Sequence, residues 1–315
     1  MLARWRGWTP TPTAVRRVFL AALIANVGIV VTGGAVRLTA SGLGCPTFPR
    51  CTDDSLVVSR EMGGHGLVEF GNRMLTFALS AVVVAAVLVA WRAGRRDLRG
   101  YALVLFGGIV AQALLGGVTV LTGLNPVTVM AHFLLSIALI AVATRAHLLS
   151  TGQPVPARRE VPPAVLAGGR GLLVVTALLL LAGTVVTGTG PHSGDKNATH
   201  RLPFDLVEVT QLHADLVFLL LGLVLGLVVA LRSTDVPPVL PRRALVLLGV
   251  VLAQGLVGYV QYATDLPIAL VAAHVLGACL VWVAALRLVL AMTTRVAPVE
   301  ADRSQEELLV SPARS

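Results

Sequence analysis

Long apolar segments, separated by short polar ones, dominate the chain. Each apolar segment is close to twenty residues long, the length at which a helix crosses the hydrocarbon core of a bilayer. The pattern therefore predicts an all-α polytopic membrane protein. The eight predicted transmembrane helices cover residues 16–36, 66–91, 101–123, 127–149, 171–189, 204–231, 243–262 and 267–292.

Composition and charge agree with this reading. Hydrophobic residues make up 56% of the 315 positions and charged residues only 13%, which a soluble protein of this length would not show. The net charge of +9 could suggest a nucleic-acid partner, but most of the 25 basic residues lie in loops on one side of the predicted spans. By the positive-inside rule, those loops and both termini are expected in the cytoplasm, with the chain in the plasma membrane. The charge thus reflects topology, and no nucleic-acid partner is expected.

The two halves of the chain resemble each other. Gln112 and His132 are 20 residues apart, and so are Gln254 and His274 in a closely similar segment. The tetrapeptide VVTG also occurs twice, at residues 30–33 and again at 185–188. Four spans therefore recur in the same orientation, which predicts two pseudo-symmetric four-helix bundles side by side.

This repeat divides the chain into parts. A segment rich in proline separates the halves, and the C-terminal end is polar. The predicted parts are an N-terminal half over residues 1–150, a cytoplasmic linker over 151–165, a C-terminal half over 166–295 and a disordered cytoplasmic tail over 296–315.

Four polar side chains lie at a similar depth in the even-numbered spans. They are Asn72, His132, His213 and His274, five to nine residues past the predicted span starts, or roughly 8–14 Å below the outer surface. Two histidines on alternate helices of one bundle suit bis-histidine ligation of a heme. The alternative is that they are ordinary polar residues that pack helices together. A zinc site is less expected, because no cysteine accompanies them.

The second span opens with an unusual cluster of polar residues, HGLVEFGNRML. His65, Glu69 and Asn72 share one helix face, since they are spaced at i, i+4 and i+7. The repeat pairs Asn72 with His213, so the second half has a histidine where the first has an asparagine. Taken alone, this face is explained equally well by a functional site or by a helix end exposed to water.

Cys45 and Cys51 lie close together in the predicted outer loop between the first two spans. Such a pair outside the cytoplasm indicates a disulfide or a redox-active dithiol, and two unrelated thiols are the alternative. Cys279 is expected to be a small core residue of the last span. His192 and His200, in the outer loop of the second half, are expected to be solvated.

Several short motifs together resemble the heme A synthase family. They are GGAVRLTASGLGCPTFPRC after the first span, VEFGNRML at the start of the second, AHF in the fourth, QLHADL in the sixth and AAHV in the eighth. The resemblance implies two four-helix halves and an oxidoreductase that oxidises a methyl group of heme O to the formyl group of heme A. The expected course passes through hydroxylated intermediates, with water as the oxygen source and an unidentified electron acceptor.

The resemblance also implies roles for individual residues. His213 and His274 would ligate the iron of heme B in the C-terminal half, and His132 the iron of the substrate heme O in the N-terminal half. Glu69 matches the family's catalytic acidic residue, and Cys45 and Cys51 match its outer cysteine pair.

One position departs from the family pattern. Asn72 stands before Arg73 where the family has histidine, and an amide is a poor iron ligand beside imidazole. Position 72 is therefore expected to be open or otherwise filled, with replacement by His65 the less favoured alternative. Arg73 is expected to pair with a heme propionate or with Glu69, and Arg37 is a second propionate candidate or an interfacial arginine.

The expected partners are heme O synthase as donor, the cytochrome oxidase assembly machinery, the lipid membrane and a second copy of the chain. The competing functions are a non-enzymatic membrane heme carrier or chaperone and a diheme electron-transfer cytochrome b. A secondary transporter is suggested by the repeat alone, but the polar residues lie near the outer face rather than at the midplane.

Overall fold

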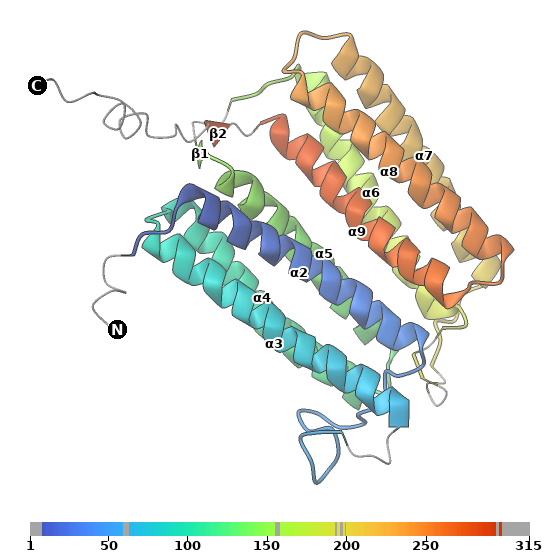
Figure 1. Cartoon of the computed structure of the whole chain (residues 1–315). Helices are drawn as coiled ribbons and strands as arrows, with labels where there is room; N and C mark the ends of the chain where they lie inside the picture. Colours follow the sequence, from blue (N-terminus) through green and yellow to red (C-terminus); the bar gives the residue numbers. More distant parts are fainter. Residues whose placement is uncertain are drawn as a thin grey trace, which may run out of the picture.

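A computed structural model describes residues 8–58, 63–154, 158–192, 194–195, 198, 200–293 and 296–297. In these residues the chain forms eight helices that are long and apolar enough to cross a membrane (Figure 1). The prediction of eight spans is confirmed. The helices are α2 (Pro12–Leu38), α3 (Gly63–Arg92), α4 (Arg96–Leu121), α5 (Pro126–Ser150), α6 (Pro163–Thr189), α7 (Leu206–Arg232), α8 (Val239–Ala263) and α9 (Ile268–Ala291).

Local sequence signals set several helix starts. Thr11, Asn125 and Asp205 cap α2, α5 and α7 by accepting hydrogen bonds from backbone N–H groups of the first turn. Helix α6 begins at Pro163, well before the predicted start at residue 171. The prediction stopped at Arg170, but this side chain is exposed, so its charged end reaches water from within the helix.

The helices form two rings of four. In the first, α2 packs on α3 and α5, while α4 packs on α3 and α5. In the second, α6 packs on α7 and α9, while α8 packs on α7 and α9. Figure 1 shows the two rings side by side, and the contact between them is made by α2 and α5 against α9 and by α5 against α6. The predicted fold class is confirmed.

This connectivity decides which helices can share an interior site. In each ring, the helices that follow one another pack side by side, so α3 lies diagonally across from α5, and α7 lies across from α9. These four helices carry the four polar side chains that the sequence places at one depth. The rings therefore bring the members of each pair toward a common interior.

A buried apolar core joins the two rings. It contains side chains of α2, α3, α4 and α5 together with Leu180 of α6 and Cys279 of α9. Cys279 is fully buried there, as expected for a small core residue. The indole N–H of Trp282 in α9 donates to the Ile137 carbonyl of α5 at 3.0 Å, which adds a polar contact between the halves.

The linker between the halves is attached to the end of α9. Strand β1 (Gln153–Pro154) pairs antiparallel with strand β2 (Val296–Ala297), and the N–H of Glu160 donates to the Met292 carbonyl at 2.9 Å. The division of the chain into four parts stays a prediction, and residues 298–315 of the predicted tail lie outside the described residues.

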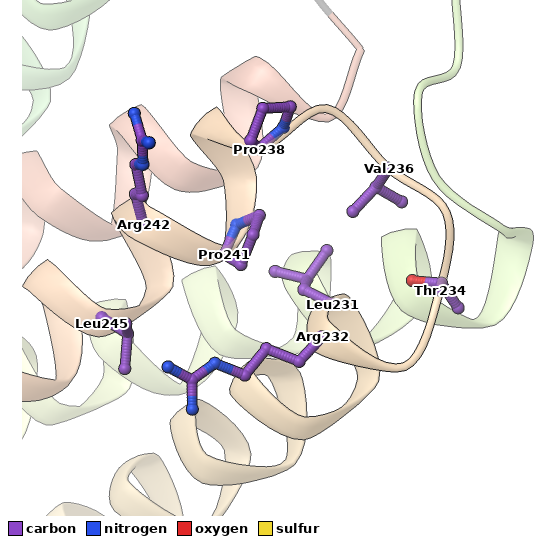
Figure 2. Close-up of a pocket in the computed structure, with 8 residues that line it drawn as sticks. All are labelled: Leu231, Arg232, Thr234, Val236, Pro238, Pro241, Arg242 and Leu245. Atoms are coloured by element: carbon purple, nitrogen blue, oxygen red, sulfur yellow. The ribbon is translucent and has the colours of Figure 1, made fainter.

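A cavity of about 400 Å³ lies where α7 turns into α8 (Figure 2). Arg232 and Arg242 lie at its edge among leucine, valine and proline side chains. Arg232 follows His213 by 19 residues on the same helix, which is about 28 Å along the axis. This cavity is therefore remote from the candidate site.

Candidate functional site

The outer loop between α2 and α3 is closed by a disulfide between Cys45 and Cys51, which confirms the first of the alternatives for these cysteines. Both cysteines are fully buried. The loop packs tightly on the start of α3, because a Cβ atom on Gly44 would lie only 2.8 Å from the backbone nitrogen of Gly66. Glycine is therefore required at this close approach.

Glu69 connects this loop to α3. The side chain is only 5% exposed, and Oε2 accepts a hydrogen bond from the N–H of Cys45 at 2.7 Å. Its other oxygen, Oε1, accepts from Nη2 of Arg73 at 2.6 Å, one helical turn further on. A buried carboxylate needs such partners, because removal from water penalises the charged form.

Arg73 binds the loop as well as Glu69. Its Nη2 donates to the carbonyls of Cys45 at 3.0 Å and Thr47 at 3.1 Å, and Nη1 donates to the carbonyl of Arg50 at 3.1 Å. The predicted contact of Arg73 with Glu69 is present. The carboxylate and the guanidinium thus hold both the N–H and carbonyl groups of the loop.

The outer loops of the two halves also bind each other. Arg37 donates to the carbonyls of His192 at 2.7 Å and Thr187 at 3.1 Å, and Gly42 donates to the Gly194 carbonyl at 2.8 Å. The prediction of a solvated His192 is wrong, since the residue is half-buried and its Nε2 interacts with the Leu266 carbonyl at 3.2 Å. His200 is exposed, as expected.

In the second half, His213 of α7 and His274 of α9 face each other with ring centroids 6.4 Å apart. Two metal–imidazole bonds of about 2.0–2.1 Å, plus about 1.1 Å from each nitrogen to its ring centre, give a separation of about 6.2–6.4 Å. The spacing therefore fits two imidazoles on opposite sides of one metal. An iron porphyrin supplies four ligands of its own, so it needs no further protein ligand.

Each imidazole of this pair lies against a glycine. A Cβ atom on Gly183 of α6 would lie 3.1 Å from Cε1 of His213, and one on Gly258 of α8 would lie 3.3 Å from Cε1 of His274. A methyl group at either position would be in tight contact with the ring and would require a shift of a few tenths of an ångström. These glycines were not identified from the sequence.

The first half repeats part of this arrangement. A Cβ atom on Gly116 of α4 would lie 3.2 Å from Cε1 of His132, and Gln112 donates to the His132 carbonyl at 3.0 Å. Gln254 donates to the His274 carbonyl in the same way at 2.9 Å. The repeat seen in the sequence therefore also holds for these contacts.

Asn72 occupies the diagonal position on α3. Its side chain is half-buried, and Oδ1 is buried with no hydrogen-bond partner among the described residues. Nδ1 of His132, of His213 and of His274 is likewise buried with no hydrogen-bond partner among the described residues. Unpaired polar atoms in a protein interior are costly, so these fit a site built around a bound group.

His65 does not join this set. The residue is exposed, and its Nδ1 lies 2.9 Å from Oγ of Ser41 at the outer end of α2. Because His65 precedes Asn72 by two helical turns, or about 10 Å, it belongs to the loop region rather than to the ring interior.

These features define a class of protein: a multi-pass helical membrane protein whose two related halves present imidazoles to the interior of helix bundles. Comparison with known proteins identifies the family. The profile of a family described as cytochrome oxidase assembly protein matches residues 16–192, more than half of the chain. The chain belongs to this family.

Two individual members of known proteins are similar in sequence to this chain. The chain is 33% identical over 125 residues to the heme A synthase of Listeria welshimeri, which covers 38% of this chain and 41% of the relative. It is 32% identical over 130 residues to the heme A synthase of Lysinibacillus sphaericus, with 39% of this chain and 40% of the relative covered. The matched segment thus spans about two fifths of these relatives. The resemblance to the heme A synthase family is confirmed.

The tight packing of the loop on α3 predicts the effect of a small substitution. Gly44→Ala places a methyl group within 2.8 Å of the α3 backbone and should force the loop away. We expect reduction of the Cys45–Cys51 disulfide by a mild reductant to become several-fold faster, measured by maleimide labelling in membranes. Gly64→Ala is the matched control, because its Cβ would meet nothing within 4 Å. Equal reduction rates for both variants would contradict the docked loop.

The ion pair predicts a second effect, on stability. Arg73→Met leaves the buried Glu69 carboxylate without its cation, which costs about 3–5 kcal/mol in comparable buried pairs. Thermal unfolding in detergent should show this loss. The double variant Glu69→Gln with Arg73→Met should be more stable than Arg73→Met alone, because no charge is left unpaired. If the two substitutions destabilise additively, the ion pair does not have this role.

Proposed function

We propose that the protein is a heme A synthase, an oxidoreductase that converts a methyl group of heme O to the formyl group of heme A. The reaction would pass through hydroxylated intermediates, with water as the oxygen source. The observation that carries this proposal is the facing pair His213 and His274, 6.4 Å apart, combined with the related but incomplete set in the first half. The family and the names of the relatives support it.

The second half would hold heme B through His213 and His274. When bound there, heme B supplies one-electron transfer to and from the reaction. The two imidazoles would hold the group between α7 and α9. Gly183 and Gly258 would leave room for the two imidazoles, since a Cβ atom at either position would lie 3.1–3.3 Å from the ring.

The first half would receive heme O through His132. Gln112 anchors this part of α5 by donating to the His132 carbonyl, and the space at Gly116 admits the imidazole. In this way α4 positions the ligand of α5. Arg73 would act on the substrate site only indirectly, by holding Glu69 and the outer loop in place. Its guanidinium is bound to Glu69 and to three loop carbonyls.

Glu69 would act as the charged group of the reaction. Positive charge that develops at the substrate methyl carbon is stabilised by a nearby carboxylate, and the same group can accept a proton from the attacking water. The hydrogen bonds from Cys45 and Arg73 fix the orientation of this carboxylate in advance. The disulfide loop would thereby position the carboxylate for the reaction.

A membrane heme carrier is the second candidate, because Asn72 leaves the first half with fewer imidazoles than the second. A diheme cytochrome b is less favoured, since it calls for a second complete pair of histidines. We further propose that heme O synthase delivers the substrate, that cytochrome oxidase assembly receives the product, and that an unidentified acceptor takes the electrons. A second copy of the chain remains a proposed partner, and both termini are proposed to face the cytoplasm from the plasma membrane.

Heme analysis tests the proposed function. The chain is expressed together with a heme O synthase, and the extracted hemes are separated and weighed by mass spectrometry. We expect heme A or its hydroxylated precursor in the wild type, and a loss of at least tenfold in Glu69→Ala and in His132→Ala. His200→Ala, in the exposed loop, is the control that should keep wild-type conversion. Unchanged heme O from a wild type that still binds heme B would favour the carrier.

A further inference from the structure

The glycines beside the histidines reveal a difference between the halves. Three imidazoles lie against a glycine of a neighbouring helix, in the pairs His132 with Gly116, His213 with Gly183, and His274 with Gly258. The repeated VVTG tetrapeptide aligns Gly183 of α6 with Gly28 of α2. Gly28 is therefore the fourth member of the set by position.

No imidazole ring packs against Gly28 among the described residues. Among the residues that the structure describes, no atom beyond its chain neighbours and the backbone of its own helix lies within 4 Å of the position that a Cβ on Gly28 would take. The amide of Asn72 instead extends toward Gly33, with Nδ2 3.9 Å from the Cβ position of that residue. The first half thus has open space beside Gly28, where the second half has the imidazole of His213 beside Gly183. The side chain that the first half supplies, Asn72, is shorter than a histidine.

Neither Glu69 nor His65 supplies the hydrogen bond that Asn72 lacks. Both carboxylate oxygens of Glu69 are engaged, by Cys45 and by Arg73. His65 is exposed and lies against Ser41. Oδ1 of Asn72 therefore remains a buried acceptor without a partner among the described residues, which is unfavourable unless a bound molecule donates to it.

We infer that a heme in the first half is ligated by His132 alone, and that its face toward Asn72 and Gly28 is a binding site for one small ligand. This inference rests on the proposed heme-binding function. Carbon monoxide and cyanide are the small ligands that test this site. Asn72 is a positioning residue here: its amide offers one acceptor and two donors to the small ligand and does not bond to the iron.

Such a site gives the two hemes different spin states. Two imidazoles produce a low-spin iron that excludes exogenous ligands, whereas one imidazole leaves an exchangeable position. The asymmetry follows from one side chain, because the glycine space is present on both sides of the repeat. Replacing Asn72 by histidine should therefore make the first half resemble the second.

The test uses the purified full chain loaded with heme B, followed by ferric EPR spectroscopy and carbon monoxide titration of the reduced protein. We expect one low-spin and one high-spin heme, with one carbon monoxide bound per chain. Asn72→His should convert the high-spin signal to low-spin and weaken carbon monoxide binding at least tenfold. His132→Ala should lose the ligand-binding heme and retain the low-spin signal, which also shows that this variant is folded.

A variant of similar size, Asn72→Leu, tests the hydrogen-bonding role of the Asn72 amide separately from its shape. Asn72→Leu should stay high-spin and bind carbon monoxide, but its ferric cyanide affinity should fall several-fold, because the donor to the bound anion is lost. Unchanged cyanide affinity would overturn the role of Asn72. Two low-spin hemes in the wild type, a single low-spin heme after loading, or a high-spin signal that survives Asn72→His would each overturn the open site.

These outcomes are separable from the proposed function. Heme A formation by a protein with two low-spin hemes would leave the enzyme proposal standing and remove the open site. A high-spin, ligand-binding heme in a protein that leaves heme O unchanged would support the open site and contradict the enzyme proposal.

Discussion

The structure depends on one constraint: a polar group inside a bilayer must find its partners within the protein, since lipid offers none. Glu69 meets this constraint by accepting from a loop N–H and from Arg73, and Arg73 meets it by donating to loop carbonyls. The disulfide keeps the loop short and closed, so its backbone groups are available in one place. The ion pair and the loop therefore stabilise each other, and neither would be stable in this position alone.

The histidines are subject to a second constraint, which is space for their rings. An imidazole in a tightly packed helix ring needs space, and glycine on the adjacent helix provides it at His132, His213 and His274. Small residues let helices and side chains approach closely in membranes, where packing drives helix association. The glycines thus allow each of these rings to pack closely against the neighbouring helix.

The sequence predicts the helices well because a transmembrane helix is specified by length and hydropathy alone. It predicts the pairing of His213 with His274 because the repeat fixes both depth and helix order. The contact between Glu69 and the N–H of Cys45 could not be predicted, since a backbone donor carries no mark in the sequence. The partial burial of His192 was missed for a related reason: its partner is the Leu266 carbonyl, which follows α8 and lies far away in the chain. The glycines could have been found by carrying the repeat alignment from the histidines to the preceding helices.

The repeat also explains why the halves can differ without loss of the fold. Cores and helix contacts on each side depend on apolar faces, whereas the disulfide loop and the residue at position 72 lie at the outer ends of the first ring. Arg37 and Gly42 join the outer loops of both halves, so a change in one loop is restrained by the other. The repeat thus gives two rings with the same order of packed helices, of which one carries the facing pair His213 and His274 and the other carries His132 on α5 and Asn72 on α3. The residues at these positions therefore differ without a difference in the order of the helices.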